Sequence, residues 1–133
     1  MQAYLTFNGN CAEALAFYAK ALGGKVVFSM TFGESPEGGK TPAAYKDKIM
    51  HATLEARGHQ LMGSDAPPEW PFEGYKGFSL SVAGNDVDDG KKVFDALAAG
   101  GKVTMPYGPQ FWAVGFGMLT DKFGVPWMVN CEK

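Results

Sequence analysis

A short segment of this chain recurs further along it, and the recurrence limits the architectures that the chain can adopt. Seven residues between Phe17 and Val26 reappear in the same order and spacing between Phe94 and Val103. Each copy ends an apolar segment of helical period with Gly-Gly and then becomes β-branched, which is typical of a helix end followed by a strand. We therefore predict two copies of one supersecondary unit, with a functional site between the two halves.

The first copy is predicted to be a βαβββ module. Apolar residues recur at helical spacing after Asn10, which we interpret as an N-cap paired with Glu13. Four β-prone segments accompany this helix: Gln2–Phe7, Lys25–Phe32, Ile49–Ala56 and Gln60–Ser64. The third and fourth segments are predicted to form a hairpin that turns at residues 57–59. Residues 33–48 show no period and are predicted to be a loop, either a lid or a disordered segment.

The second copy is predicted to have the same order. Asp86 is the expected N-cap of its helix, and Val87, Val93, Phe94 and Leu97 are expected to face the core. Its strands are predicted at Gly77–Val82, Lys102–Tyr107, Gly115–Thr120 and Pro126–Cys131. The fold class is α+β, in one domain spanning 1–133. Module 1 covers about 1–64, a proline-containing linker covers 65–76, and module 2 covers about 77–133.

Composition excludes several classes of function. The net charge is −2 and no basic run is present, so no nucleic-acid partner is expected. No apolar stretch approaches the roughly 18 residues of a membrane span, and the first residues lack the features of a secretory signal. The two cysteines, Cys11 and Cys131, favour a reduced, cytoplasmic protein. Cys11 is either an activated thiol at a helix start or, as we favour, a small apolar residue there.

Several motifs resemble those of a known family. Phe7-Asn8-Gly9-Asn10-Cys11, His51-Ala52 and Met62-Gly63-Ser64-Asp65 carry part of the resemblance. The most specific stretch is Phe111-Trp112, followed by Gly115-Phe116-Gly117 and then by Thr120-Asp121-Lys122-Phe123-Gly124-Val125-Pro126-Trp127. These motifs resemble the PhnB-like family of the vicinal oxygen chelate superfamily, which includes glyoxalase I, extradiol dioxygenases and drug-resistance proteins. The resemblance implies that two modules form a cupped, incomplete antiparallel barrel with helices on the convex face.

Metal-dependent members of that superfamily hold a divalent ion with four inward side chains from the first and last strands of both modules. By resemblance these positions fall near Ala3, Met62, Gly77 and Met128, none of which ligates a hard divalent cation. The neighbouring residues Tyr4 and Phe78 would not restore such a site. We therefore expect no metal in the usual place and no cofactor, while a displaced divalent-metal site stays open.

One strand carries the acid–base candidates. In Ile49–Ala56, His51, Thr53 and Glu55 alternate with apolar residues and therefore share one face. If that face lines the cup, His51 and Glu55 could bind a ligand or relay protons; the alternative is a solvated or dimer-facing polar surface. Asp65 either faces the mouth of the cup as a third catalytic candidate or is a turn-forming carboxylate.

Aromatic and sulfur-containing residues form the predicted ligand-binding set. Phe111 and Trp112, beside Gln110, would give a flat apolar wall at the entrance of the cup, or would pack as core beneath a loop. Met62 and Met128 would make the floor of the cup apolar and adaptable, whereas Trp127 would face the helix layer.

The sequence favours a small-molecule-binding protein, assembled as a homodimer because an open sheet leaves edge strands to be covered. The first alternative is an enzyme acting on a small metabolite, with a displaced metal or with acid–base chemistry through His51 and either Glu55 or Asp65. The second alternative is a dimeric scaffold that binds no small ligand.

Overall fold

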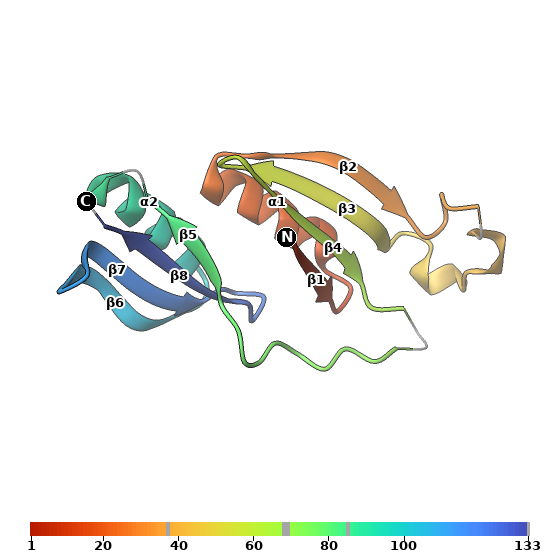
Figure 1. The fold of residues 1–133 in the computed structure, drawn as a ribbon. Coiled ribbons are helices and arrows are strands. Elements are labelled where there is room, and N and C mark those ends of the chain that lie inside the picture. The colour runs from red at the N-terminus through yellow and green to blue at the C-terminus, as the bar shows by residue number, and fades with distance from the viewer. Residues whose placement is uncertain (37, 68–69, 85, 133) are drawn as a thin grey trace. The chain divides into compact units, whose positions relative to one another are not determined.

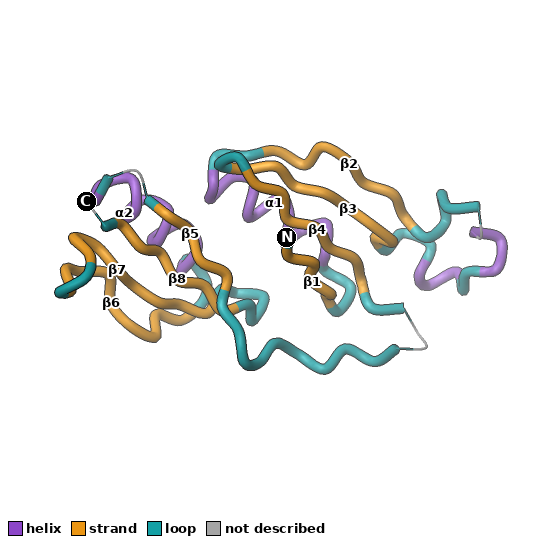
Figure 2. Tube along the Cα trace, in the orientation of Figure 1, coloured by secondary structure: helices purple, strands orange, loops and turns teal. Residues whose placement is uncertain are grey.

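The computed structural model describes residues 1–36, 38–67, 70–84 and 86–132, and its chain divides into two compact units, Met1–Glu73 and Gly74–Lys133. Each unit has one four-stranded sheet and one α-helix (Figures 1 and 2). The predicted α+β class and the order of both βαβββ modules are confirmed.

The first unit contains β1 (Ala3–Phe7), α1 (Cys11–Leu22), β2 (Lys25–Thr31), β3 (Ile49–Ala56) and β4 (His59–Asp65). Two short 3₁₀ turns, at Gly38–Lys40 and Ala43–Tyr45, interrupt the predicted loop 33–48, in which residue 37 lies outside the described residues. The second unit contains β5 (Leu80–Ala83), α2 (Val87–Ala98), β6 (Lys102–Gln110), β7 (Ala113–Thr120) and β8 (Pro126–Cys131).

Both sheets are mixed, which corrects the prediction of antiparallel sheets. The strand orders are β1-β4-β3-β2 and β5-β8-β7-β6, and β1 runs parallel to β4 as β5 does to β8. The reason is topological. A helical crossover makes the second strand of each module run in the direction of the first, and two hairpin reversals then return the last strand to that direction.

Several predicted boundaries differ from the structure, and three of them involve candidate site residues. Strand β5 begins at Leu80 rather than Gly77, because Gly77 has a left-handed φ of 82° that an extended strand cannot continue through. Strand β6 continues past Tyr107 to Gln110. Asp65 belongs to β4 rather than to the linker, whose residues 68–69 lie outside the described part of the chain.

In each unit the helix covers one face of the sheet, and the apolar core of the unit lies between that helix and that sheet. Helix α1 buries Ala14, Leu15 and Tyr18 against apolar residues of β1 and β3 such as Phe7 and Leu54. Helix α2 buries its predicted core residues except Val87, which is 41% exposed. That prediction was wrong because Val87 stands in the first turn, beside the exposed end of the helix. Among the described residues, no helix is long and apolar enough to span a bilayer.

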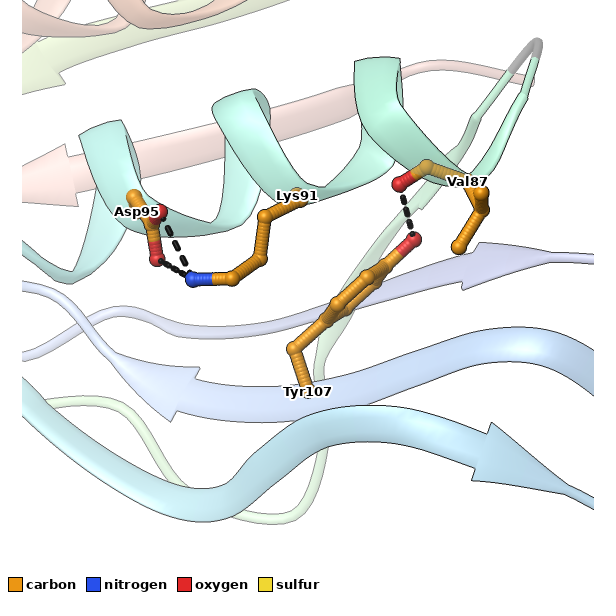
Figure 3. A network of polar contacts seen from close by, with 4 residues as sticks. All are labelled: Val87, Lys91, Asp95 and Tyr107. Carbon is orange, nitrogen blue, oxygen red and sulfur yellow. Dashed lines mark hydrogen bonds and ion pairs between the residues drawn. The ribbon is translucent and has the colours of Figure 1, made fainter.

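A tyrosine fixes α2 to its sheet (Figure 3). The Tyr107 hydroxyl donates a hydrogen bond of 2.9 Å to the Val87 carbonyl oxygen, and its ring lies 5.5 Å from that of Phe94. Gly90 and Gly115 leave the space that the hydroxyl occupies, because a Cβ at either position would collide with it. An exposed Lys91–Asp95 ion pair of 2.8 Å on α2, also drawn in Figure 3, adds little to stability.

Candidate functional site

The first sheet has a polar and aromatic face on the side opposite α1. Along β3, Ala52 and Leu54 are buried, whereas His51 and Thr53 are partly exposed and Glu55 is exposed. This alternation places His51, Thr53 and Glu55 on one face, as their spacing predicts. Cross-strand pairing brings Tyr4, Met62 and Thr53 level with one another on three neighbouring strands.

His51 is the centre of a compact group on this face, which we call the His51 cluster: Tyr4, Phe28, His51 and Thr53. The Tyr4 hydroxyl lies 3.2 Å from His51 Nδ1, and Thr53 Oγ1 lies 3.2 Å from Nε2. The rings of Tyr4 and Phe28 lie 5.6 and 5.9 Å from the imidazole, and these two side chains are 47% and 46% exposed. The cluster therefore offers flat apolar surface beside an imidazole that two hydroxyl groups hold in place.

Glu55 belongs to a separate chain of polar contacts. Its carboxylate accepts a 3.3 Å hydrogen bond from Gln60 Nε2, and Gln60 Oε1 accepts one of 2.9 Å from Gln2 Nε2. Glu55 lies four positions along the strand from His51, which corresponds to about 13 Å. The structure therefore pairs His51 with two hydroxyl groups and leaves Glu55 in a different part of the same face.

Asp65 has a structural place in the fold. Its side chain is 1% exposed, and it accepts hydrogen bonds of 2.9 Å from the Cys11 N–H and 2.8 Å from the Ile49 N–H. These bonds join the end of β4 to the starts of α1 and β3. Asp65 lies on the α1 side of the sheet, away from the His51 cluster, because β4 alternates and Ser64 precedes it on the other face.

The Cys11 thiol is not poised to act as a nucleophile. Burial, assisted by the negative charge of Asp65, raises its pKa to about 12. A thiol with that pKa stays protonated at neutral pH, and only the thiolate is a strong nucleophile. The geometry therefore agrees with the interpretation of Cys11 as a small apolar residue at a helix start.

The second sheet carries sulfur and aromatic side chains on the face opposite α2. Met118 of β7 pairs with Met128 of β8, and Phe116 pairs with Asn130. Trp112 contacts Phe116 edge to face at 5.3 Å and Phe111 at 4.8 Å. Phe111 is 97% exposed and Trp112 43%, so they do not pack as core beneath the loop.

Three further residues of this sheet are informative. Trp127 is buried, as predicted, and its Nε1–H donates to Asp121 Oδ2 at 2.8 Å. Sequence reasoning missed Asn130, whose buried Oδ1 accepts no hydrogen bond from the described residues. Gln110 is exposed at the end of β6, where it pairs with Ala113 across the turn.

Strand register corrects two of the four positions that correspond to metal ligands. Tyr4, rather than Ala3, lies level with Met62 on the face opposite α1. Ser81, rather than Gly77, lies level with Met128 in the second sheet, since Gly77 precedes the strand. A phenol, an alcohol and two thioethers do not fit a hard divalent cation, which prefers carboxylate and imidazole ligands. Across the described ranges, no group of three or more His, Cys, Asp or Glu side chains could hold a metal ion.

Comparison with known proteins places these sheets in a family. The family model of the Glyoxalase/Bleomycin resistance protein/Dioxygenase superfamily matches residues 2–129, so the chain belongs to that superfamily. It is 42% identical over 138 residues to Protein YjdN of Escherichia coli (strain K12), with 98% of this chain and 93% of that protein covered.

Two solved structures extend the comparison. Protein PA1353 from Pseudomonas aeruginosa is 52% identical, with a TM-score of 0.91 and coverage of 99% of this chain and 96% of that one. The PhnB protein from Bacillus cereus is 27% identical, with a TM-score of 0.81 and coverage of 98% of both chains. The predicted PhnB-like membership is therefore confirmed.

Proposed function

We propose that this protein binds a small organic molecule on the sheet faces opposite its helices, without the divalent metal of the metal-dependent superfamily members. The observation that carries the proposal is the set of side chains at the four ligand positions, Tyr4, Met62, Ser81 and Met128. These side chains replace metal-ligating groups with apolar and weakly polar surface.

The surroundings of these positions suit a flat, partly apolar ligand. Tyr4 and Phe28 are half-exposed beside His51 in the first unit, and Trp112 is half-exposed beside Phe116 in the second. Exposed aromatic rings supply rigid contact area, and methionine side chains adapt to ligands of varied shape. The Tyr4 and Thr53 hydroxyl groups, which His51 holds in place, would orient the ligand with hydrogen bonds.

The test begins with the metal content of protein purified without chelator. A melting-temperature screen against Mn, Fe, Ni, Co and Zn follows, together with small aromatic compounds. We expect no stoichiometric metal, no metal-dependent shift, and a shift with some aromatic compounds that grows with their concentration, as binding linkage requires. A stoichiometric metal whose binding is lost in His51→Ala would refute the proposal and indicate a displaced site.

The hydrogen bond between Tyr4 and His51 favours one second candidate, an enzyme that uses His51 as a general acid or base on a small metabolite. A phenol and an imidazole 3.2 Å apart can exchange a proton. Glu55 and Asp65 are less suited to assist, because Asp65 is buried behind the sheet and Glu55 is bound to Gln60. An activity that survives His51→Ala and Tyr4→Phe unchanged would eliminate this candidate.

We also propose a homodimer. Strand β2 is an edge of the first sheet, and its Val26, Val27 and Phe28 are each at least 40% exposed. An exposed apolar edge strand favours pairing with another chain, which would cover it. Sedimentation equilibrium over a range of concentrations tests this proposal, and a monomer at all concentrations would contradict it.

A further inference from the structure

A cavity of about 760 Å³ lies at the hairpin end of the first sheet, beyond the His51 cluster. The start of the chain, the connection from α1 to β2, and the β3–β4 hairpin line it. The polar residues of this lining, which we call the hairpin cavity, are Gln2, Lys25, Glu55, Arg57, His59 and Gln60. Its volume falls within the range of roughly 300–1,000 Å³ that is typical of small-molecule sites.

The hairpin cavity concentrates positive charge in a protein whose net charge is −2. Lys25 and Arg57 contribute two permanent cations and His59 an imidazole, whereas Glu55 is the only carboxylate side chain among the described residues of the lining. Lys25 lies opposite Glu55 in the strand register, yet no ion pair joins them in the described part of the chain. A concave surface of this charge attracts anions.

Arg57 adds an independent observation. It has a φ of 53° at the hairpin turn, where it precedes Gly58 with a φ of 80°. Asn, Asp and Gly fit the first position of such a turn with less strain than a long side chain does. An arginine at this position is therefore not explained by the turn, but its guanidinium is suited to bind a carboxylate or a phosphoryl group.

Uncharged hydrogen-bonding groups lie beside the cations. The amides of Gln2 and Gln60 form a chain that ends at the Glu55 carboxylate, with distances of 2.9 and 3.3 Å. The hydrogen-bond partner of the Glu55 carboxylate is thus the uncharged amide of Gln60 and not the Lys25 ammonium. Within the described residues, the charge of Lys25 therefore has no direct ion pair with Glu55. Side-chain amides both donate and accept hydrogen bonds, and they therefore suit the hydroxyl groups of a ligand.

We propose that the hairpin cavity binds a small hydroxylated organic anion, whose carboxylate or phosphoryl group contacts Lys25 and Arg57 and whose hydroxyl groups contact Gln2 and Gln60. This inference does not depend on the proposed function, because the cavity is separate from the His51 cluster. A variant that loses anion binding in the hairpin cavity should therefore keep ligand binding at the His51 cluster, and the reverse should also hold.

The test uses glucose 6-phosphate, gluconate and uncharged glucose as probes, with binding followed by amide chemical shifts in ¹⁵N-labelled full-length protein. The two anions distinguish phosphoryl from carboxylate recognition. We expect at least one anion to bind at least tenfold more tightly than glucose, to weaken at higher salt, and to shift the amides of Lys25 and residues 57–60.

The variants are Lys25→Gln and Arg57→Asn, and the latter removes the charge with a residue that tolerates the left-handed conformation. Lys102→Gln is the matched control, because Lys102 is the exposed repeat counterpart of Lys25 in the second unit. Each test variant should weaken anion binding about tenfold or more, and the control should leave it unchanged. Any of three results would overturn the inference. The protein could bind neither anion, it could bind glucose as tightly as both anions, or Lys25→Gln and Lys102→Gln could have equal effects on anion binding.

Discussion

Replacement of Asp65 by alanine tests whether this carboxylate stabilises the fold rather than taking part in chemistry. The buried side chain accepts bonds from the N–H groups of Cys11 and Ile49 at 2.9 and 2.8 Å. Hydrogen bonds to charged groups contribute about 1.5–3 kcal/mol each, and the substitution leaves two buried donors unpaired. We therefore expect Asp65→Ala to lower the free energy of unfolding by about 3–5 kcal/mol, a large fraction of the roughly 5–15 kcal/mol of a typical domain.

The assay is urea unfolding followed by circular dichroism, with Asp65→Asn and Asp47→Ala measured in parallel. Asp65→Asn keeps the shape of the side chain and one acceptor, so it should lose about half as much stability as Asp65→Ala. Asp47 is exposed close to the start of β3, and its removal should cost less than about 0.5 kcal/mol. An Asp65→Ala protein whose free energy of unfolding lies within about 1 kcal/mol of that of the Asp47→Ala control would refute the reasoning.

Three further predictions concern other parts of the fold. Asn130→Leu should raise the melting temperature, because it removes a buried carbonyl that accepts no hydrogen bond from any residue that the structure describes, at a cost of about 1–3 kcal/mol. A lower melting temperature would contradict this. Asp86→Ala should lower the free energy of unfolding, measured in urea, by about 1 kcal/mol, because the Asp86 side chain accepts a hydrogen bond of 2.7 Å from the Asp89 N–H. Asn10→Ala should lower it by less, because the Asn10 side chain makes no capping hydrogen bond. Since burial raises the pKa of Cys11 from 9.0 to about 12, the folded state binds more protons than the unfolded state between these values. The free energy of unfolding should therefore fall as pH rises through this range, and the fall should be shallower in Cys11→Ala; equal slopes would contradict the assignment.

Much of the fold could be predicted because local signals agreed with the tertiary packing. The Gly-Gly helix ends, the alternation in β3 and the Asp86 cap each depend on nearby residues, and the structure confirms the elements that they indicate. Strand direction could not be obtained in this way. Whether β1 runs parallel or antiparallel to β4 depends on a partner more than 50 residues away in the chain.

The candidate site was predictable only in part, for the same reason. The shared face of His51, Thr53 and Glu55 follows from the period of one strand. The contact of His51 with Tyr4 and Phe28 depends on strand pairing with two other segments. The burial of Asp65 and the register that replaces Gly77 by Ser81 likewise follow from long-range pairing.

The sequence by itself determined the duplicated βαβββ module and the family, because these properties reside in residue identity, order and local period. Only the tertiary structure decided that Asp65 joins α1 to β3, that His51 lies between two aromatic rings, and that Lys25 and Arg57 line one cavity. Such contacts join side chains from separate strands and turns. Their chemistry therefore depends on register and burial, which short stretches of sequence do not encode.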